Sequence, residues 1–289
     1  MRLDDEREST NFEIQDGRGG VGGGLGGGLG LLLPLIGSRF GCGGIVVVLI
    51  IMAVMGVNPL SLMGGGGQMP QSGEVSRDSS RLSDVQHWSL KVLGSTERVW
   101  GSLFQQAGQQ YQPTVLSFYS QNGSSGCGAA QSAMGPFYCP NDRKVYLDTD
   151  FFTELRQRFG APGDFAQAYV IAHEVGHHVQ DLEGTLGEVN QKQRAVSEAQ
   201  GNALQVRVEL QADCYAGVWA KRTGLMEPGD LEEGMKAAQA IGDDTLQKAA
   251  GRRPVPESFT HGTSEQRMTW LRKGLDSGDP AQCDTFKGA

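Results

Sequence analysis

The hydrophobic residues of this chain form one continuous run near the N-terminus and several helix-spaced sets beyond it. No charged residue occurs between positions 40 and 73, and positions 45–55 are apolar throughout. With the flanking glycines, this run reaches about the 17–20 residues that a membrane-spanning helix needs. We therefore predict one transmembrane helix over residues 40–60, followed by a Gly/Ser-rich linker over 61–80.

The residues ahead of this run are polar or glycine-rich. Positions 1–16 have mixed charge without apolar periodicity, and positions 17–30 are mostly glycine. Both patterns are typical of disorder, so residues 1–39 are predicted to be a disordered, Gly-rich tail. Arg39 precedes the apolar run and Glu74 is the first charge after it, which favours a cytoplasmic tail. A cleaved signal peptide is the alternative, and the long polar region ahead of the run opposes it.

Beyond residue 81 the pattern predicts a mostly helical α+β domain over 81–289. Apolar residues recur at helical spacing in several segments, and shorter stretches have strand composition bounded by turn residues. A small sheet is expected ahead of the helix that starts near Asp164. The predicted helices are 83–107, 148–159, 164–182, 191–223, 230–242 and 264–275, and the predicted strands are 112–119, 135–139 and 144–147.

The composition limits the classes of binding partner and indicates the redox compartment of the protein. The chain has 289 residues, a formal net charge of −8 and no basic cluster, which argues against a nucleic-acid-binding protein. Of its five cysteines, Cys42 lies in the apolar run, and the other four follow it without a C-x-x-C pair. An even number of cysteines after a membrane segment favours disulfides in an oxidising compartment. Buried thiols in a cytosolic domain are the alternative.

We predict the pairs Cys127–Cys139 and Cys214–Cys283. The first pair flanks a short loop, and the second would hold the C-terminal tail against the segment that follows Asp213. Other pairings, which would tie the hairpin region to that segment or to the tail, stay open. With the charge bias, these bridges predict a single-pass membrane protein with an extracytoplasmic domain.

At 173–177 the chain reads His-Glu-Val-Gly-His, inside a largely apolar predicted helix. His173 and His177 would lie one turn apart on the same helix face, where two ring nitrogens can bind one Zn²⁺. Glu174 would then be the general base toward a water activated by the metal. The alternative is a chance pattern, in which both histidines pack or cap in a core.

A catalytic zinc site needs a third protein ligand. Glu209 lies far enough beyond His177 for the chain to turn and return as an antiparallel helix. Asp213 shares its helix face and would accept the second ring N–H of a ligand histidine. A solvated acidic face is the alternative, but the residues from Ala212 to Trp219 are largely apolar, which favours a buried role.

This arrangement, His-Glu-x-x-His followed by Glu-x-x-x-Asp, resembles the gluzincin metallopeptidases. The flanking motifs are similar to those of the bacterial putative neutral zinc metallopeptidase family, over roughly residues 72–286. They are Gly-Pro-Phe-Tyr-Cys-Pro at 135–140, Val-Tyr-Leu-Asp at 145–148, Ala-His-Glu-Val-Gly-His-His-Val-Gln at 172–180, Glu-Leu-Gln-Ala-Asp-Cys-Tyr-Ala-Gly at 209–217 and Phe-Thr-His-Gly-Thr-Ser-Glu-Gln-Arg at 259–267. The resemblance implies a zinc metallopeptidase fold, a peptide or protein substrate, and a bacterial inner or cell membrane as the predicted membrane.

The remaining histidines have different expected roles. His178 follows the second ligand by about 100° around the helix, so it is expected to point elsewhere. By resemblance, His261 is expected to stabilise the oxyanion and Arg267 to hold the segment around it. An exposed helix-cap histidine is the alternative for His261.

These features together predict a membrane-anchored zinc metalloendopeptidase in which His173, His177 and Glu209 bind Zn²⁺. An extended substrate is expected to pair with a strand at 137–138 or 145–147. A membrane-tethered binding or scaffolding protein with a structural zinc site is the rival hypothesis. Glu174 separates the two, because a structural site does not need a general base.

Overall fold

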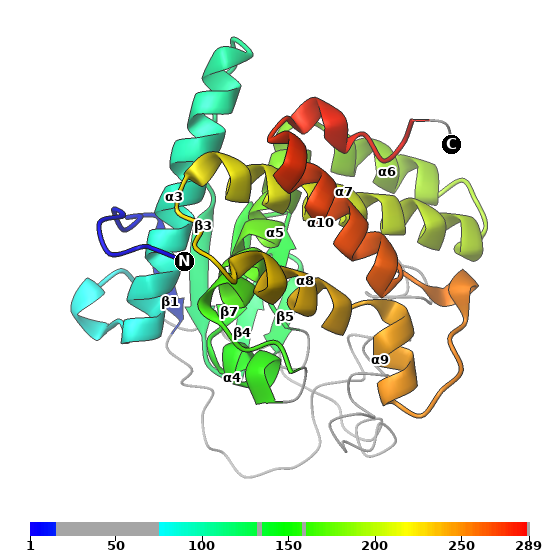
Figure 1. Cartoon of the computed structure of the whole chain (residues 1–289), viewed down its shortest axis with the longest axis horizontal. Coiled ribbons are helices and arrows are strands. Elements are labelled where there is room, and N and C mark those ends of the chain that lie inside the picture. Colours follow the sequence, from blue (N-terminus) through cyan, green and yellow to red (C-terminus); the bar gives the residue numbers. More distant parts are fainter. Residues whose placement is uncertain (16–74, 132–134, 158–159, 288–289) are drawn as a thin grey trace.

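A five-stranded sheet lies beside a group of helices in the computed structural model, which describes residues 1–15, 75–131, 135–157 and 160–287 (Figure 1). The strand order is β2-β1-β3-β7-β6, with β1, β3 and β7 parallel and both outer strands antiparallel to their neighbours. The strands are β1 (Phe12–Gln15), β2 (Val75–Ser76), β3 (Val115–Tyr119), β6 (Phe137–Cys139) and β7 (Lys144–Asp148). A separate hairpin, β4 (Asn122–Ser125) and β5 (Gly128–Gln131), lies outside the predicted strands.

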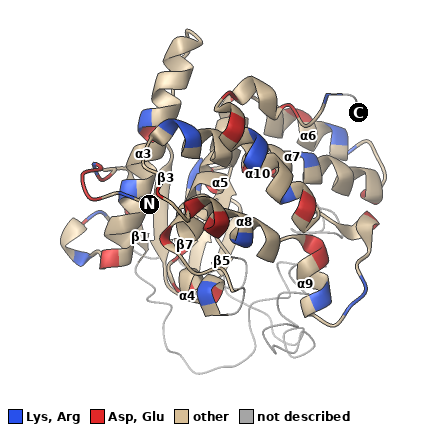
Figure 2. Cartoon of the chain, viewed as in Figure 1, with Lys and Arg blue, Asp and Glu red and all other residues tan. Residues whose placement is uncertain are grey.

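The N-terminal residues belong to this sheet. Phe12 pairs with Leu116 of β3, and Gln15 pairs with Val75 of β2. The Met1 ammonium group lies 2.8 Å from Asp164 and 3.1 Å from Asp230, among the acidic residues that Figure 2 shows at the start of helix α8 (Asp230–Ala240). The prediction of disorder over 1–39 is therefore wrong for residues 1–15. Their four-residue strand is too short for its alternation to stand out, and tertiary pairing decides its conformation.

No helix within the described residues is both long enough and apolar enough to cross a membrane. The helix predicted over 40–60 lies outside the described residues.

The position of β1 also bears on topology. Because β1 lies between β2 and β3, residues 1–15 and the domain that starts at 75 form one folded unit. They must therefore lie on the same side of any membrane. The predicted division into a cytoplasmic tail and an extracytoplasmic domain is wrong for residues 1–15.

The helices largely follow the sequence pattern, with two differences. The helix predicted over 191–223 begins only at Glu198, where Ser197 and Gln200 form a capping box, and Thr185–Gln193 forms a separate helix. A short helix after residue 242 was not predicted. The helices are α3 (Asp84–Gln106), α4 (Asp150–Gln157), α5 (Asp164–Leu182), α6 (Thr185–Gln193), α7 (Glu198–Thr223), α8 (Asp230–Ala240), α9 (Asp243–Ala249) and α10 (Ser264–Ser277).

Helix α5 is central, in contact with α3, α7 and α8 and with strands β6 and β7. It approaches α7 closely at Gly176, where an added Cβ would lie 3.0 Å from the Ala212 carbonyl oxygen. Helix α10 crosses α7 at Gly217 and Gly274, where a side chain would overlap the facing backbone (Figure 1). These glycines let the three helices that carry the candidate site lie nearly in backbone contact.

Both predicted disulfides are confirmed. Cys127–Cys139 joins the hairpin to β6, with the Cα atoms 5.8 Å apart. Cys214–Cys283 joins α7 to the C-terminal tail, with the Cα atoms 5.6 Å apart. The fold is thus mostly helical α+β with a small sheet, as expected, and its C-terminal tail is held against α7.

Candidate metal centre

Helices α5 and α7 bring two histidines and one glutamate together. His173 and His177 lie one turn apart on α5, and Glu209 faces them from α7. The Glu209 Oε2 atom is 3.1 Å from His173 Nε2 and 3.5 Å from His177 Nε2. Ligand atoms about 2.0–2.1 Å from a tetrahedral Zn²⁺ lie roughly 3.3 Å apart, so these three donors fit one zinc ion. A His₂Glu set with a fourth position for water is typical of catalytic zinc sites.

The ring of His173 is held by a buried charged network. Its Nδ1 lies 2.9 Å from Asp213 Oδ1, which also accepts a 2.6 Å hydrogen bond from the Tyr169 hydroxyl. Arg267, from α10, donates to both carboxylate oxygens of Asp213, each at 2.9 Å. Asp213 is fully buried and Arg267 is 2% exposed. The Asp213 carboxylate therefore directs Nε2 of His173 toward Glu209.

The ring of His177 is held by a neutral side chain. Its Nδ1 lies 2.9 Å from the amide oxygen Oε1 of Gln180, on the next turn of α5. With Nδ1 occupied in this way, Nε2 is the ring atom directed at Glu209. In both histidines the atom that faces the cluster is thus free to act as a metal ligand.

Buried charges set the ionisation of this cluster. Burial opposes charge on His173, but the Asp213 carboxylate outweighs it and raises the His173 pKa to about 9. Burial also opposes charge on Asp213, but Arg267 and His173 lower its pKa to about 2. The same competition, decided mainly by His177, holds the pKa of Glu209 well below its ordinary value. Glu209 and Asp213 are therefore carboxylates at neutral pH, and binding of Zn²⁺ at Nε2 of His173 would displace the second proton of that ring.

Glu174 lies beside the cluster on α5 and is 7% exposed. Burial raises its pKa, and the two neighbouring histidines oppose this effect. A carboxylate with a raised pKa accepts a proton more readily, which suits a general base.

His261 also lies near the metal cluster. The residue that holds its segment is Asp243 and not, as expected, Arg267. Asp243, at the start of α9, accepts a hydrogen bond from the His261 backbone N–H at 2.6 Å and lies 3.3 Å from Nδ1. It also accepts from the backbone N–H groups of Thr260 and Gly262. The expectation that Arg267 holds this segment is wrong, because the Arg267 guanidinium pairs with Asp213. The sequence pattern carried no sign of Asp243, since α9 itself was not recognised.

The comparison with protein families agrees with this geometry. The family model described as putative neutral zinc metallopeptidase matches residues 1–286. The chain belongs to this family. The match includes the N-terminal strand, which the sequence resemblance over 72–286 left out.

Two relatives extend along most or all of the chain. The uncharacterized protein YpfJ of Escherichia coli (strain K12) is 46% identical over 291 residues, which cover 99% of each chain. The uncharacterized protein Rv2575 of Mycobacterium tuberculosis (strain ATCC 25618 / H37Rv) is 43% identical over 227 residues, which cover 73% of each chain. No solved structure matches this family member.

His178, which directly follows the second candidate ligand, points away from the cluster. Its Nε2 lies 2.6 Å from the Gln112 carbonyl oxygen, and its Nδ1 lies 3.1 Å from the Tyr138 hydroxyl of β6. Burial lowers its pKa. His178 therefore joins α5 to the edge of the sheet as a neutral ring, as its position on the helix indicates.

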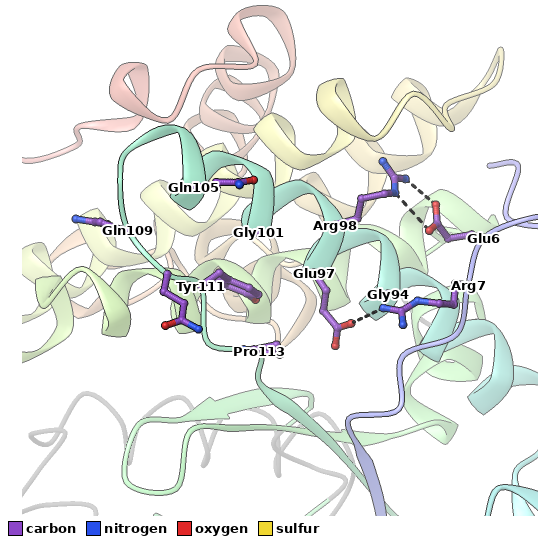
Figure 3. A pocket seen from close by; sticks show the side chains of 11 residues that line it. Glu6, Arg7, Gly94, Glu97, Arg98, Gly101, Gln105, Gln109, Tyr111 and Pro113 are labelled. Atoms are coloured by element: carbon purple, nitrogen blue, oxygen red, sulfur yellow. Dashed lines mark hydrogen bonds and ion pairs between the residues drawn. The ribbon is translucent and has the colours of Figure 1, made fainter.

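A cavity of about 670 Å³ lies along α3, between the N-terminal segment and the loop at 109–113 (Figure 3). Two ion pairs line it, Arg98 with Glu6 and Arg7 with Glu97. The Tyr111 hydroxyl beside it is buried and has no hydrogen-bond partner among the described residues. No residue of the metal cluster lines this cavity, so it is distinct from the candidate centre.

Proposed function

We propose that this protein is a gluzincin-type zinc metallopeptidase that hydrolyses peptide bonds. His173, His177 and Glu209 would hold Zn²⁺, and the observation that carries the proposal is the convergence of their three donor atoms. When bound, Zn²⁺ supplies a Lewis acid that lowers the pKa of water toward about 7 and polarises a carbonyl group.

Glu174 acts as the general base and then as the general acid. Its carboxylate takes a proton from the attacking water and returns that proton to the leaving amine. The raised pKa that burial gives Glu174 favours the first transfer and keeps the proton available for the second.

His261 stabilises the negative charge that develops on the substrate carbonyl oxygen. Asp243 orients this ring through Nδ1, which leaves Nε2 as the donor toward the reacting group. The Asp243 carboxylate raises the pKa of His261 against the effect of burial, so the ring retains its proton more readily. One donor of this kind is worth about 2.7–4 kcal/mol of transition-state stabilisation in other enzymes.

Strand β6 is the better of the two predicted strands for pairing with an extended substrate. Strand β7 lies between β3 and β6, so both of its edges are used. Strand β6 is an outer strand of the sheet in the described residues and contacts α5. A peptide added beside β6 would lie along the helix that carries the metal ligands.

The deciding experiment compares Glu174→Gln with the wild type on an unfolded protein substrate, with and without a chelator. We expect one zinc per chain in both proteins and hydrolysis in the wild type alone, because the variant keeps every ligand. The double variant His177→Ala with Glu209→Ala is the control that loses zinc. A wild type that binds zinc and cleaves nothing would favour the rival, a binding protein with a structural zinc site.

We also propose that residues 40–60 attach the protein to the membrane without a single crossing between residues 15 and 75, because β1 and β2 belong to one sheet, and that the domain lies outside the cytoplasm. The two disulfides support an oxidising compartment. Because β1 belongs to the sheet, cysteines introduced at the exposed positions Asp5 and Lys192 should react from the same side with an impermeant maleimide. Labelling of one position in intact cells and of the other only after lysis would contradict the shared sheet. Labelling of both only after lysis would contradict the extracytoplasmic domain.

A further inference from the structure

A chain of buried amides connects His177 to the C-terminal tail. Gln180 accepts from His177 at 2.9 Å and donates through Nε2 to Gln211 Oε1, also at 2.9 Å. Gln211 in turn donates to the Cys283 carbonyl oxygen at 3.1 Å. Gln180 and Cys283 are fully buried and Gln211 is 7% exposed, so water competes little for these bonds.

The direction of each amide is determined by its partners. Both N–H bonds of Gln180 are used, one toward Gln211 and one toward the Val208 carbonyl oxygen at 2.8 Å. Its oxygen must therefore face His177, which requires the proton of that ring to be on Nδ1. In the neutral ring this fixes the tautomer in which Nε2, the nitrogen directed at Glu209, carries no proton, as a metal ligand requires.

The orientation of Gln211 depends on the tail. The Cys283 carbonyl accepts its N–H, so the amide oxygen of Gln211 is turned toward Gln180. The Cys214–Cys283 disulfide anchors this part of the tail, and Arg207 and Thr285 exchange hydrogen bonds just beyond it. The last residues of the chain thus orient a metal ligand through two glutamines.

We propose that Gln180 and Gln211 are positioning residues for His177, and that the Cys214–Cys283 disulfide raises zinc affinity through them. This inference rests on the zinc site of the proposed function and goes beyond it. It assigns a role in metal binding to a tail that contributes no ligand.

The first test is a chelator-competition measurement of zinc affinity on the full chain. We expect Gln180→Leu to weaken zinc binding by about 10–100-fold, because it removes the direct partner of a ligand. Gln211→Leu should weaken it by about 2–10-fold, the effect of one more distant hydrogen bond. Gln247→Leu is the matched control, since Gln247 on α9 is 5% exposed and its two hydrogen bonds go to Val255 and Ser258, neither of them a ligand.

The unfolding free energies of the same variants distinguish positioning of His177 from a contribution to the stability of the fold alone. If all three glutamines stabilise the fold alone, the variants lose comparable stability and none changes zinc affinity. If the inference is correct, only Gln180→Leu and Gln211→Leu weaken zinc binding. Wild-type affinity in Gln180→Leu would overturn the positioning role while leaving the proposed function intact. Absence of zinc from the wild type would instead overturn the proposed function.

The second test compares the two disulfides. Cys214→Ser with Cys283→Ser should weaken zinc by about 2–10-fold, whereas Cys127→Ser with Cys139→Ser should not. In a Gln211→Leu background, removal of the Cys214–Cys283 bridge should not lower the zinc affinity further, because the hydrogen bonds between Cys283, Gln211 and Gln180 are already lost. Equal zinc affinity in the two serine pairs would overturn the role of the tail. If the protein with Cys214→Ser and Cys283→Ser fails to fold, the zinc affinity of Gln211→Leu alone still decides whether Gln211 positions His177.

Discussion

The two histidines of the metal centre lie one helical turn apart, yet different chemistry holds each of them. His173 donates to Asp213, a fully buried carboxylate whose charge is balanced by Arg267. His177 donates to Gln180, a neutral amide within a chain of amides. The charged support depends on residues from three helices, whereas the first member of the neutral support comes from α5 itself.

The difference has an energetic consequence. A buried ion pair that loses one member leaves an uncompensated charge, whereas a neutral amide that is lost leaves only unpaired dipoles. Substitutions among the residues that hold His173 should therefore change the unfolding free energy, the zinc affinity and the response to acid. Substitutions among the residues that hold His177 should change mainly the zinc affinity.

The largest expected effect is on stability. Arg267→Leu leaves Asp213 buried without its partner and should lower the unfolding free energy by about 3–5 kcal/mol. Urea unfolding of the metal-free protein measures this change. Arg272→Leu on the same helix is the control, because Arg272 is exposed and its loss should change stability by about 0.5 kcal/mol or less. Equal losses of unfolding free energy in the two variants would show that the Asp213–Arg267 ion pair contributes no more to stability than an exposed arginine.

Replacing both members of the pair should separate stability from metal binding. Asp213→Leu combined with Arg267→Leu leaves no uncompensated charge, so it should recover most of the stability lost in Arg267→Leu. Zinc affinity should still be about 10–100-fold weaker, because His173 has lost its carboxylate partner. Chelator competition beside urea unfolding checks both parts. Recovered zinc affinity in the double variant would remove Asp213 from the support of the metal.

The smallest expected effect is the response to acid. The Asp213 pKa falls from 3.8 to about 2 in the folded protein, because Arg267 and His173 outweigh the effect of burial. Its contribution to stability is therefore present above about pH 4 and is lost as the pH falls toward 2. In metal-free protein, the Asp213→Leu, Arg267→Leu double variant should lose less stability between pH 4 and 2 than the wild type. Gln180→Leu should keep the wild-type slope, because no titrating group is removed.

The residues of the candidate site could be predicted where they lie within a helical turn of one another along the chain. The spacing of His173, Glu174 and His177 follows from helix geometry, and Glu209 with Asp213 repeats the same spacing on a second helix. Tyr169 and Gln180 lie within one turn of the ligands on α5, so the same rule could have pointed to them. Asp243 had no comparable signal, because it reaches His261 from a short helix that the apolar pattern did not reveal.

By itself, the sequence determined most of the helices, the metal-binding motif and most of the sheet. Each of these follows from residues that are close along the chain, whereas the predicted cysteine pairing was decided among its alternatives only by the tertiary structure. Only the tertiary structure decided that Arg267 supports Asp213 instead of the His261 segment, and that the C-terminal tail bonds to Gln211, which in turn bonds to the Gln180 partner of His177. It also decided that residues 1–15 supply an inner strand of the sheet, because neighbouring strands stabilise four residues whose own pattern is too short to specify one.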